Sequence, residues 1–344
     1  MKRLPFFGLF LLPLTIVSTV LAATAPVSPT IAKIRKANAL VCGIDQNEAE
    51  YSTTDDHGAR VAFDQDVCKA VAAAVLGPNA KVVVEGYPDD QTAMAALRSG
   101  EVDLIASLSA DFAHATDPSL GLTRPVLYDG VAVMVPASSH VTRTQDLSGK
   151  KVCFIAETEP EVALRAWFEA NHLVFVPFPF QEEGEMEAAY ITNNCTGLAG
   201  DLTRLAVTRS DFGPHAEDYI LLPEVISKDP LAIAWRISDP QWGKFLDWVV
   251  NALLQAEESG ITAANLDAMR ASHDPVVERL LGNTHELGRP LGLDDRWAAN
   301  AIAAAGNYGE IFIRDLGAKS PLHLSRGQNE LWNHGGLMYA LPFK

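Results

Sequence analysis

The sequence is poor in positive charge. Its 344 residues include 27 lysines and arginines against 43 aspartates and glutamates, so the formal net charge is −16. A surface this acidic repels the phosphate backbone of nucleic acids, and DNA or RNA binding is therefore not expected. The charge alone does not indicate which small molecule the protein binds.

The sequence also lacks the short motifs of common enzymes and metal sites. The nine histidines are scattered, with no H-E-x-x-H, and there is no G-x-S-x-G. The four cysteines form no C-x-x-C and have no neighbouring histidine, which argues against a zinc site. We therefore expect no metal, no cofactor and no catalytic residues, and the protein is not expected to be an enzyme.

One long apolar run is present, at the N-terminus. Lys2 and Arg3 precede the almost wholly apolar run 4–21, and small residues at 22–25 offer a cleavage site. A membrane anchor is the alternative, but two prolines interrupt a run that barely reaches the roughly 20 residues needed. With no cysteine nearby for a lipid anchor, residues 1–25 predict a cleaved signal peptide. The mature chain is then periplasmic and not embedded in the membrane.

The rest of the sequence predicts two α/β units, in which strands alternate with helices. The first has expected strands at 39–44, 81–85 and 102–106, with helices at 31–39, 64–76 and 89–99. The second has expected strands at 151–155, 174–178 and 197–200, with helices at 161–171 and 183–192. This alternation predicts, for each unit, a mostly parallel sheet flanked by helices.

The two units are expected to form two lobes joined twice, near 131–136 and near 227–235. A further strand at 232–236 and a long amphipathic helix at 240–260 return the chain to the first lobe. The predicted division is 26–133 plus 236–344 for lobe 1, with a C-terminal extension at 279–344 containing helices at 296–305 and 328–333, and 134–235 for lobe 2. Two links make a hinge, and ligand sites favour such interfaces.

In an oxidising compartment, the even cysteine count indicates disulfides. Cys42, Cys68, Cys153 and Cys195 allow three pairings. We favour Cys42–Cys68 and Cys153–Cys195, because each bridge would then lie within one proposed lobe.

Several stretches carry a resemblance to a known family. They include VCGI at 41–44, DVCKAVAAAVLG at 66–77, SGEVDL at 99–104, SLGL at 119–122, LSGKKVC at 147–153, GNYGEIF at 306–312 and RGQNELWNHGGLMYA at 326–340. The chain resembles the periplasmic substrate-binding proteins of amino-acid ABC transporters (family 3 solute-binding proteins), in their general L-amino-acid-binding branch.

The resemblance implies a two-lobed, type II Venus-flytrap fold, with two hinge crossovers, that closes on a small polar ligand. The ligand would be an amino acid or related amine, delivered to a membrane permease of an ABC transporter, and we expect a monomer. Two alternatives on the same fold are a sensory or accessory binding protein and, less favoured, a lyase like the cyclohexadienyl dehydratases.

The resemblance also places ligand contacts on individual residues. Tyr51 and Phe112 stand where aromatic side chains cover the ligand, although an exposed loop tyrosine or a core phenylalanine would explain them equally well. Asp201 stands where an aspartate holds the ligand's ammonium group, and it could instead cap the following helix.

At the positions where the family binds the α-carboxylate of its ligand, this sequence departs from the family's pattern. Thr116 replaces the arginine that pairs with an α-carboxylate, and a run of small hydroxyl residues has acquired Asp111. Where the family has a Gly-Thr-Thr turn in the second lobe, this sequence has Glu157-Thr158-Glu159. These two acids would either repel a ligand carboxylate or only cap a helix. We interpret this as a cleft altered toward a cationic or carboxylate-poor ligand, such as an amine, or toward a non-transport role.

Overall fold

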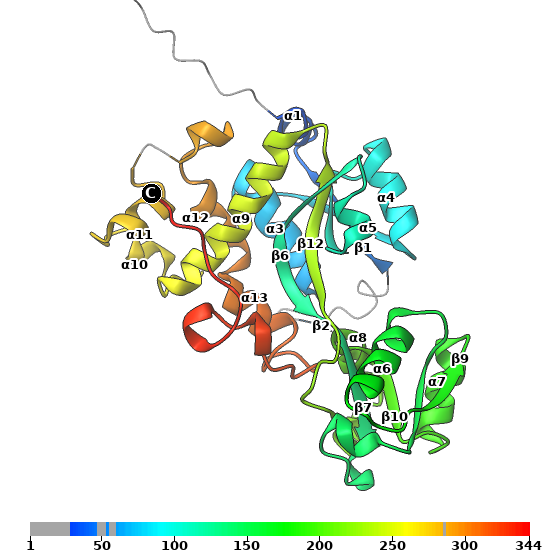
Figure 1. Cartoon of the computed structure of the whole chain (residues 1–344). Helices are drawn as coiled ribbons and strands as arrows, with labels where there is room; N and C mark the ends of the chain where they lie inside the picture. Colours follow the sequence, from blue (N-terminus) through cyan, green and yellow to red (C-terminus); the bar gives the residue numbers. More distant parts are fainter. Residues whose placement is uncertain (1–27, 47–52, 55–59, 285–286) are drawn as a thin grey trace, which may run out of the picture.

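The computed structural model describes residues 28–46, 53–54, 60–284 and 287–344. They form two lobes, each built on a five-stranded mixed sheet with flanking helices (Figure 1). The two-lobed α/β architecture expected from the sequence is confirmed. None of the helices in these ranges is long and apolar enough to cross a membrane.

The sheet of the first lobe has the strand order β4-β1-β5-β12-β6. β1 (Leu40–Asp45) runs parallel to β4 (Val82–Tyr87) and β5 (Leu104–Ser109). β12 (Asp229–Arg236) runs antiparallel to β5 and to β6 (Leu120–Asp129). The direction reverses because β6 carries the chain out to the second lobe and β12 brings it back.

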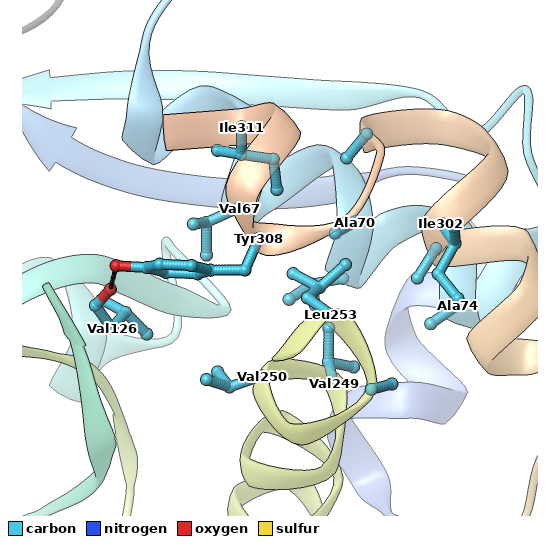
Figure 2. Close-up of a cluster of buried hydrophobic side chains, with 14 of the residues drawn as sticks. Val67, Ala70, Ala74, Val126, Val249, Val250, Leu253, Ile302, Tyr308 and Ile311 are labelled. Atoms are coloured by element: carbon cyan, nitrogen blue, oxygen red, sulfur yellow. Dashed lines mark hydrogen bonds between the residues drawn. The ribbon is translucent and has the colours of Figure 1, made fainter. Parts of the chain in front are cut away.

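Helices cover both faces of this sheet, and the C-terminal region completes its core. The helices are α1 (Pro29–Ala37), α3 (Phe63–Leu76), α4 (Asp90–Ser99), α9 (Pro240–Glu258), α10 (Leu266–Met269), α11 (Pro275–Leu280), α12 (Trp297–Ala305) and α13 (Tyr308–Asp315). Side chains of α3, α9, α12 and α13 form one buried cluster, in which the Tyr308 hydroxyl donates to the Val126 carbonyl at 3.0 Å (Figure 2). The chain from 297 to 315 is therefore part of the first lobe.

The expected C-terminal helices are only partly present. The helix expected at 296–305 is α12, whereas the one expected at 328–333 is two short 3₁₀ turns, Gly327–Asn329 and Trp332–His334. α13 was not predicted. Gly335 and Gly336 follow closely, and a side chain at Gly336 would meet the Glu330 carbonyl at 1.9 Å, so the chain folds back on itself there instead of continuing as a helix.

The sheet of the second lobe has the order β11-β7-β10-β8-β9. Its strands are β7 (Val131–Pro136), β8 (Lys151–Ile155), β9 (Val176–Phe180), β10 (Gly197–Asp201) and β11 (Tyr219–Leu221). Its helices are α6 (Glu159–Ala170), α7 (Glu183–Ile191) and α8 (Leu202–Asp211). Within it β8 is parallel to β9 and β10, and β7 is antiparallel to β10 and β11.

The chain passes between the sheets at Gly130 and again between β11 and β12. The segments expected as links, 131–136 and 227–235, are therefore largely strands, since the apolar run of β7 is buried and pairs with β10. The crossings pass close together: a Cβ on Gly130 would lie 2.7 Å from the Ser227 carbonyl oxygen, and the φ of Gly130 is +154°. Only glycine fits this position without displacing the returning chain.

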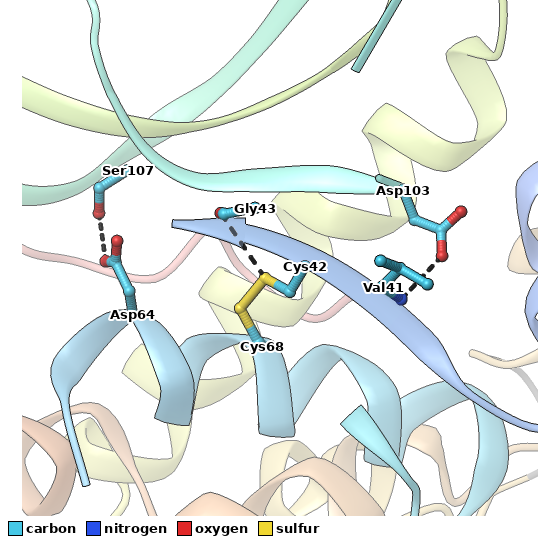
Figure 3. Close-up of a disulfide and its surroundings, with 7 residues drawn as sticks. All are labelled: Val41, Cys42, Gly43, Asp64, Cys68, Asp103 and Ser107. Carbon is cyan, nitrogen blue, oxygen red and sulfur yellow. Dashed lines mark hydrogen bonds between the residues drawn. A yellow bond between two sulfur atoms is a disulfide. The ribbon is translucent and has the colours of Figure 1, made fainter. Parts of the chain in front are cut away.

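Each lobe contains one disulfide. Cys42 of β1 is bonded to Cys68 of α3 in the first lobe (Figure 3), and Cys153 of β8 to Cys195 in the second. The pairing favoured from the sequence is the one present.

Candidate functional site

A cavity of about 400 Å³ lies where the two lobes meet, and we call it the interlobe cavity. The first lobe supplies residues from β1, β5, α3 and α4, and the second supplies residues from β10, α7 and α8. The chain after α13 supplies a third group, so the cavity has three walls. The lining includes Asp45, Asp64, Ser107, Ser109, Asp129, Asp201, Thr203, Asp229, Leu316 and Leu322.

The polar lining of this cavity is strongly acidic. Its carboxylates are Asp45, Asp64, Asp89, Asp90, Asp129, Glu183, Asp201, Asp229 and Asp315. Among the described lining residues Arg204 is the only lysine or arginine, and it forms an ion pair with Glu183. The described lining therefore contains nine carboxyl groups and one basic side chain.

Asp201 has the most informative environment of these carboxylates. It ends β10 at the N-cap position of α8, yet its side chain accepts no capping hydrogen bond from that helix. Burial and, to a smaller extent, repulsion from Asp129, Asp229 and Glu159 together raise its pKa to about 7, although Arg204 acts in the opposite direction. A helix-capping role therefore does not account for this residue, and the site favours a positive charge beside it.

A second group of carboxylates lies along the first lobe. Burial raises the pKa of Asp229, and Asp111 and Asp90 add to this, while Ser109 and His114 act in the opposite direction. Burial likewise raises the pKa of Asp90, against the effect of His114. These shifts show that the acids are close enough to repel one another.

Two further carboxylates are held by hydroxyl groups. The Ser107 hydroxyl of β5 donates to Asp64 in the first turn of α3 (Figure 3), and the Thr203 hydroxyl of α8 donates to Asp129 at the end of β6. Both carboxylates are buried. Hydrogen bonds compensate part of the cost of burying such groups, and the Thr203 bond crosses from one lobe to the other.

Of the ligand-binding residues predicted from the sequence, some line the cavity and others do not. Asp201 lines the interlobe cavity. Glu159 and Asp111 do not line it, although Glu159 raises the pKa of Asp201, and Asp111 raises those of Asp90 and Asp229. Tyr51 lies outside the described residues.

Asp111, Phe112 and Thr116 belong to α5 (Phe112–Ala115) and its two caps. Asp111 accepts a hydrogen bond from the backbone N–H of His114 at 2.8 Å, and the Thr116 hydroxyl donates to the Phe112 carbonyl at 2.7 Å. The Phe112 side chain is 85% exposed. Neither Phe112 nor Thr116 is among the residues that line the cavity.

The turn Glu157-Thr158-Glu159 opens α6. Glu157 has a positive φ of +63°, and its N–H donates to the Glu161 carboxylate at 3.0 Å. The Thr158 hydroxyl donates to the Ile155 carbonyl at 2.5 Å. The Glu161 carboxylate thus accepts the hydrogen bond of the first amide in this turn. The side chains of Glu157 and Glu159 are exposed.

Several lining residues were missed from the sequence, among them Asp45, Asp64, Asp90, Asp129 and Asp229. Their places carry a signal: Asp45 and Asp129 end strands, and Asp64 and Asp90 open helices. In α/β folds, ligand sites gather at the carboxyl ends of strands and the adjoining helix starts. Asp129 could not be found in this way, because it ends β6, a strand that the sequence did not predict.

Comparison with known proteins places the chain in a family. No family model matches it. The glutamate/glutamine/aspartate/asparagine-binding protein BztA of Rhodobacter capsulatus is 37% identical over 346 aligned positions, covering 100% of both chains. The general L-amino acid-binding periplasmic protein AapJ of Rhizobium johnstonii is 38% identical, covering 94% of this chain and 95% of that protein. The chain belongs to the periplasmic amino-acid-binding proteins of ABC transporters.

Solved structures of periplasmic binding proteins have the same fold as this chain. An ABC transporter/periplasmic binding protein from Brucella ovis with glutathione bound superposes with a TM-score of 0.80, at 34% identity over 92% of this chain and 99% of that one. The second substrate-binding domain of GlnP from Lactococcus lactis, in its open conformation, has the same fold, with a TM-score of 0.52 at 15% identity. That domain matches 65% of this chain, so the periplasmic binding protein described here is considerably larger than the shared fold.

Proposed function

We propose that this periplasmic binding protein captures a small amine in the interlobe cavity and delivers it to the membrane permease of an ABC transporter. The relatives named above bind amino acids, as their names state. The amine is the part of an amino acid that this cavity is built to hold. An α-carboxylate is not, because the one basic side chain in the described lining, Arg204, is paired with Glu183, and Thr116 stands where the resemblance places an arginine.

The observation that carries the proposal is the charge of the lining. Asp201, Asp129 and Asp229 come from different elements. Asp129 and Asp229 both raise the pKa of Asp201, and Asp229 also raises that of Asp129, so this repulsion costs free energy in the empty cavity. An ammonium group donates three hydrogen bonds and would relieve that repulsion. An added carboxylate would increase it, with Arg204 already paired to Glu183.

Isothermal titration of the refolded, ligand-free protein tests this directly. We expect 1,4-diaminobutane and simple monoamines to bind, and L-glutamate and L-glutamine to bind far more weakly. Asp201→Asn should weaken amine binding at least tenfold. Asp218→Asn is the matched control, because Asp218 is an exposed acid of the same lobe.

Micromolar binding of several neutral or acidic L-amino acids, with no binding of amines, would overturn the proposal. Mass spectrometry of the small molecules released when purified protein is denatured gives a second readout. A carboxylate-free amine in that extract supports the proposal, and an acidic amino acid contradicts it.

A further inference from the structure

The third wall of the interlobe cavity comes from the end of α13 and the chain that follows it. Asp315, Leu316 and Leu322 all line the cavity. Their exposed fractions are 2%, 7% and 5%, so these side chains are packed inward. We call residues 316–322 the third-wall loop.

The third-wall loop is fixed to the first lobe at its start. Arg314 forms an ion pair with Asp66 of α3, and its Nε donates to the Asp315 carboxylate at 3.2 Å. Asp315 is buried beside Asp66, and burial and this neighbour together raise its pKa. The Leu324 N–H donates to the Leu316 carbonyl at 2.9 Å, which closes the base of the loop.

The same loop reaches the second lobe at its last residue. Arg209 of α8 donates to the Leu322 carbonyl at 2.5 Å. Ala206 and Val207 of α8 are buried in the cluster that contains Leu316 and Leu322, and Val207 also lines the cavity. The loop therefore contributes an apolar surface to the cavity and contacts both lobes beside it.

We propose that the third-wall loop is part of the ligand site and that Leu316 and Leu322 select amines carrying an aliphatic chain. This inference rests on the proposed function. The acidic residues hold the ammonium group, and the leucines, with Val207, remove the chain from water. Burying one methylene group favours binding about fourfold. A cavity of about 400 Å³ leaves room for several such groups beside the ammonium.

The test is the affinity of a series of n-alkylamines, from methylamine to hexylamine, for the full mature chain. For the wild type we expect affinity to rise about three- to fourfold with each methylene until the alkyl chain covers the apolar surface of the third-wall loop. In Leu322→Ala and Leu316→Ala the affinity should rise less steeply with each added methylene. Lys319→Ala is the control, because Lys319 is exposed in the same loop and should behave as the wild type.

One further variant keeps the outcomes separate. Leu322→Met retains apolar volume and should keep the wild-type dependence on chain length, even if Leu322→Ala folds poorly. A flat dependence in the wild type, or one unchanged by both alanine variants, overturns this inference. If methylamine binds through Asp201 but chain length has no effect, the proposed function stands and only this inference fails. If no amine binds at any length, the proposed function itself fails.

Discussion

The Thr203 hydroxyl donates a hydrogen bond to the Asp129 carboxylate across the crossing between the lobes. Asp129 is the last residue of β6, and Thr203 lies in the first turn of α8. The Gly130 N–H donates to the other carboxylate oxygen at 2.8 Å. Burial raises the pKa of Asp129 despite these bonds, so the two lobes meet at a buried acid whose charge is only partly compensated.

Thr203→Val should therefore destabilise the protein. The substitution keeps the side-chain shape and removes a donor from a buried carboxylate, which typically costs about 1–3 kcal/mol. Urea unfolding of the ligand-free protein measures the loss. Thr192→Val is the control, because the exposed Thr192 hydroxyl bonds only to groups close in sequence: it donates to carbonyls of its own helix and accepts from Asn194. Equal effects of the two substitutions would show that the bond between the lobes contributes nothing.

Amine binding should weaken as the pH falls through 7. The pKa of Asp201 is about 7 in the empty cavity, so the carboxylate is mostly charged at pH 8 and mostly protonated at pH 6. A cation binds the charged form, and we expect affinity to fall about tenfold between these two pH values. Titration calorimetry at both values, on the wild type and Asp201→Asn, tests it. A variant as pH-dependent as the wild type would contradict the assignment to Asp201.

The same pKa predicts how the stability of the empty protein depends on pH. The folded-state pKa of Asp201 lies above the value of about 3.9 expected for the unfolded chain. Its contribution is then fully present below the unfolded value and is lost as the pH rises through 7. The wild type should thus lose more stability than Asp201→Asn between pH 6 and pH 8, as measured by urea unfolding. A saturating amine should reduce that difference.

The sequence predicted the two-lobed α/β fold because its strands and helices alternate with clear periods and clear stops. Gly100 ends α4 as expected, and the buried strand KVCFI at 151–155 has its predicted bounds. β6 and β7 were missed, since a long strand interrupted by Pro125 gives no regular alternation and the apolar segment 131–136 was expected as a link. The crossing at Gly130 depends on contact with Ser227, about a hundred positions later, which no local pattern reveals.

The site was less predictable than the fold. Asp201 could be identified because it follows a predicted strand and matches the family's pattern. The cavity also depends on Asp64, Asp229 and the third-wall loop, which come together only when segments far apart in sequence pack. Leu316 and Leu322 look like ordinary core residues in the sequence, and their place in the cavity follows from the docking of α13 on α3 and α9.

Each disulfide should stabilise its own lobe. The bridges close loops with sequence separations of 26 and 42 residues, and replacing each pair with alanine should cost about 2–4 kcal/mol. The Cys153–Cys195 pair should cost slightly more, because its loop is longer. Urea unfolding of the two variants measures this. Neither bridge lines the cavity, so amine affinity well below the unfolding midpoint should stay near the wild-type value.

Trp235 of β12 packs between two glycines, and this packing should tolerate no added methyl group. A Cβ on Gly243 of α9 would lie 2.1 Å from the indole, and one on Gly121 of β6 would lie 2.3 Å from it. Gly243→Ala should destabilise by about 1–3 kcal/mol, although alanine is the better helix former. Thermal unfolding measures the change, and Trp235→Leu in the same chain should recover part of it.

Gly184 provides the matched comparison for that substitution. It lies in α7, and no heavy atom would approach within 4 Å of a Cβ placed there. Gly184→Ala should then be neutral or stabilising by up to about 1 kcal/mol, because only the helix preference changes. If Gly243→Ala behaves like Gly184→Ala, the indole moves at little cost, and the contact between β12 and α9 is looser than the structure indicates.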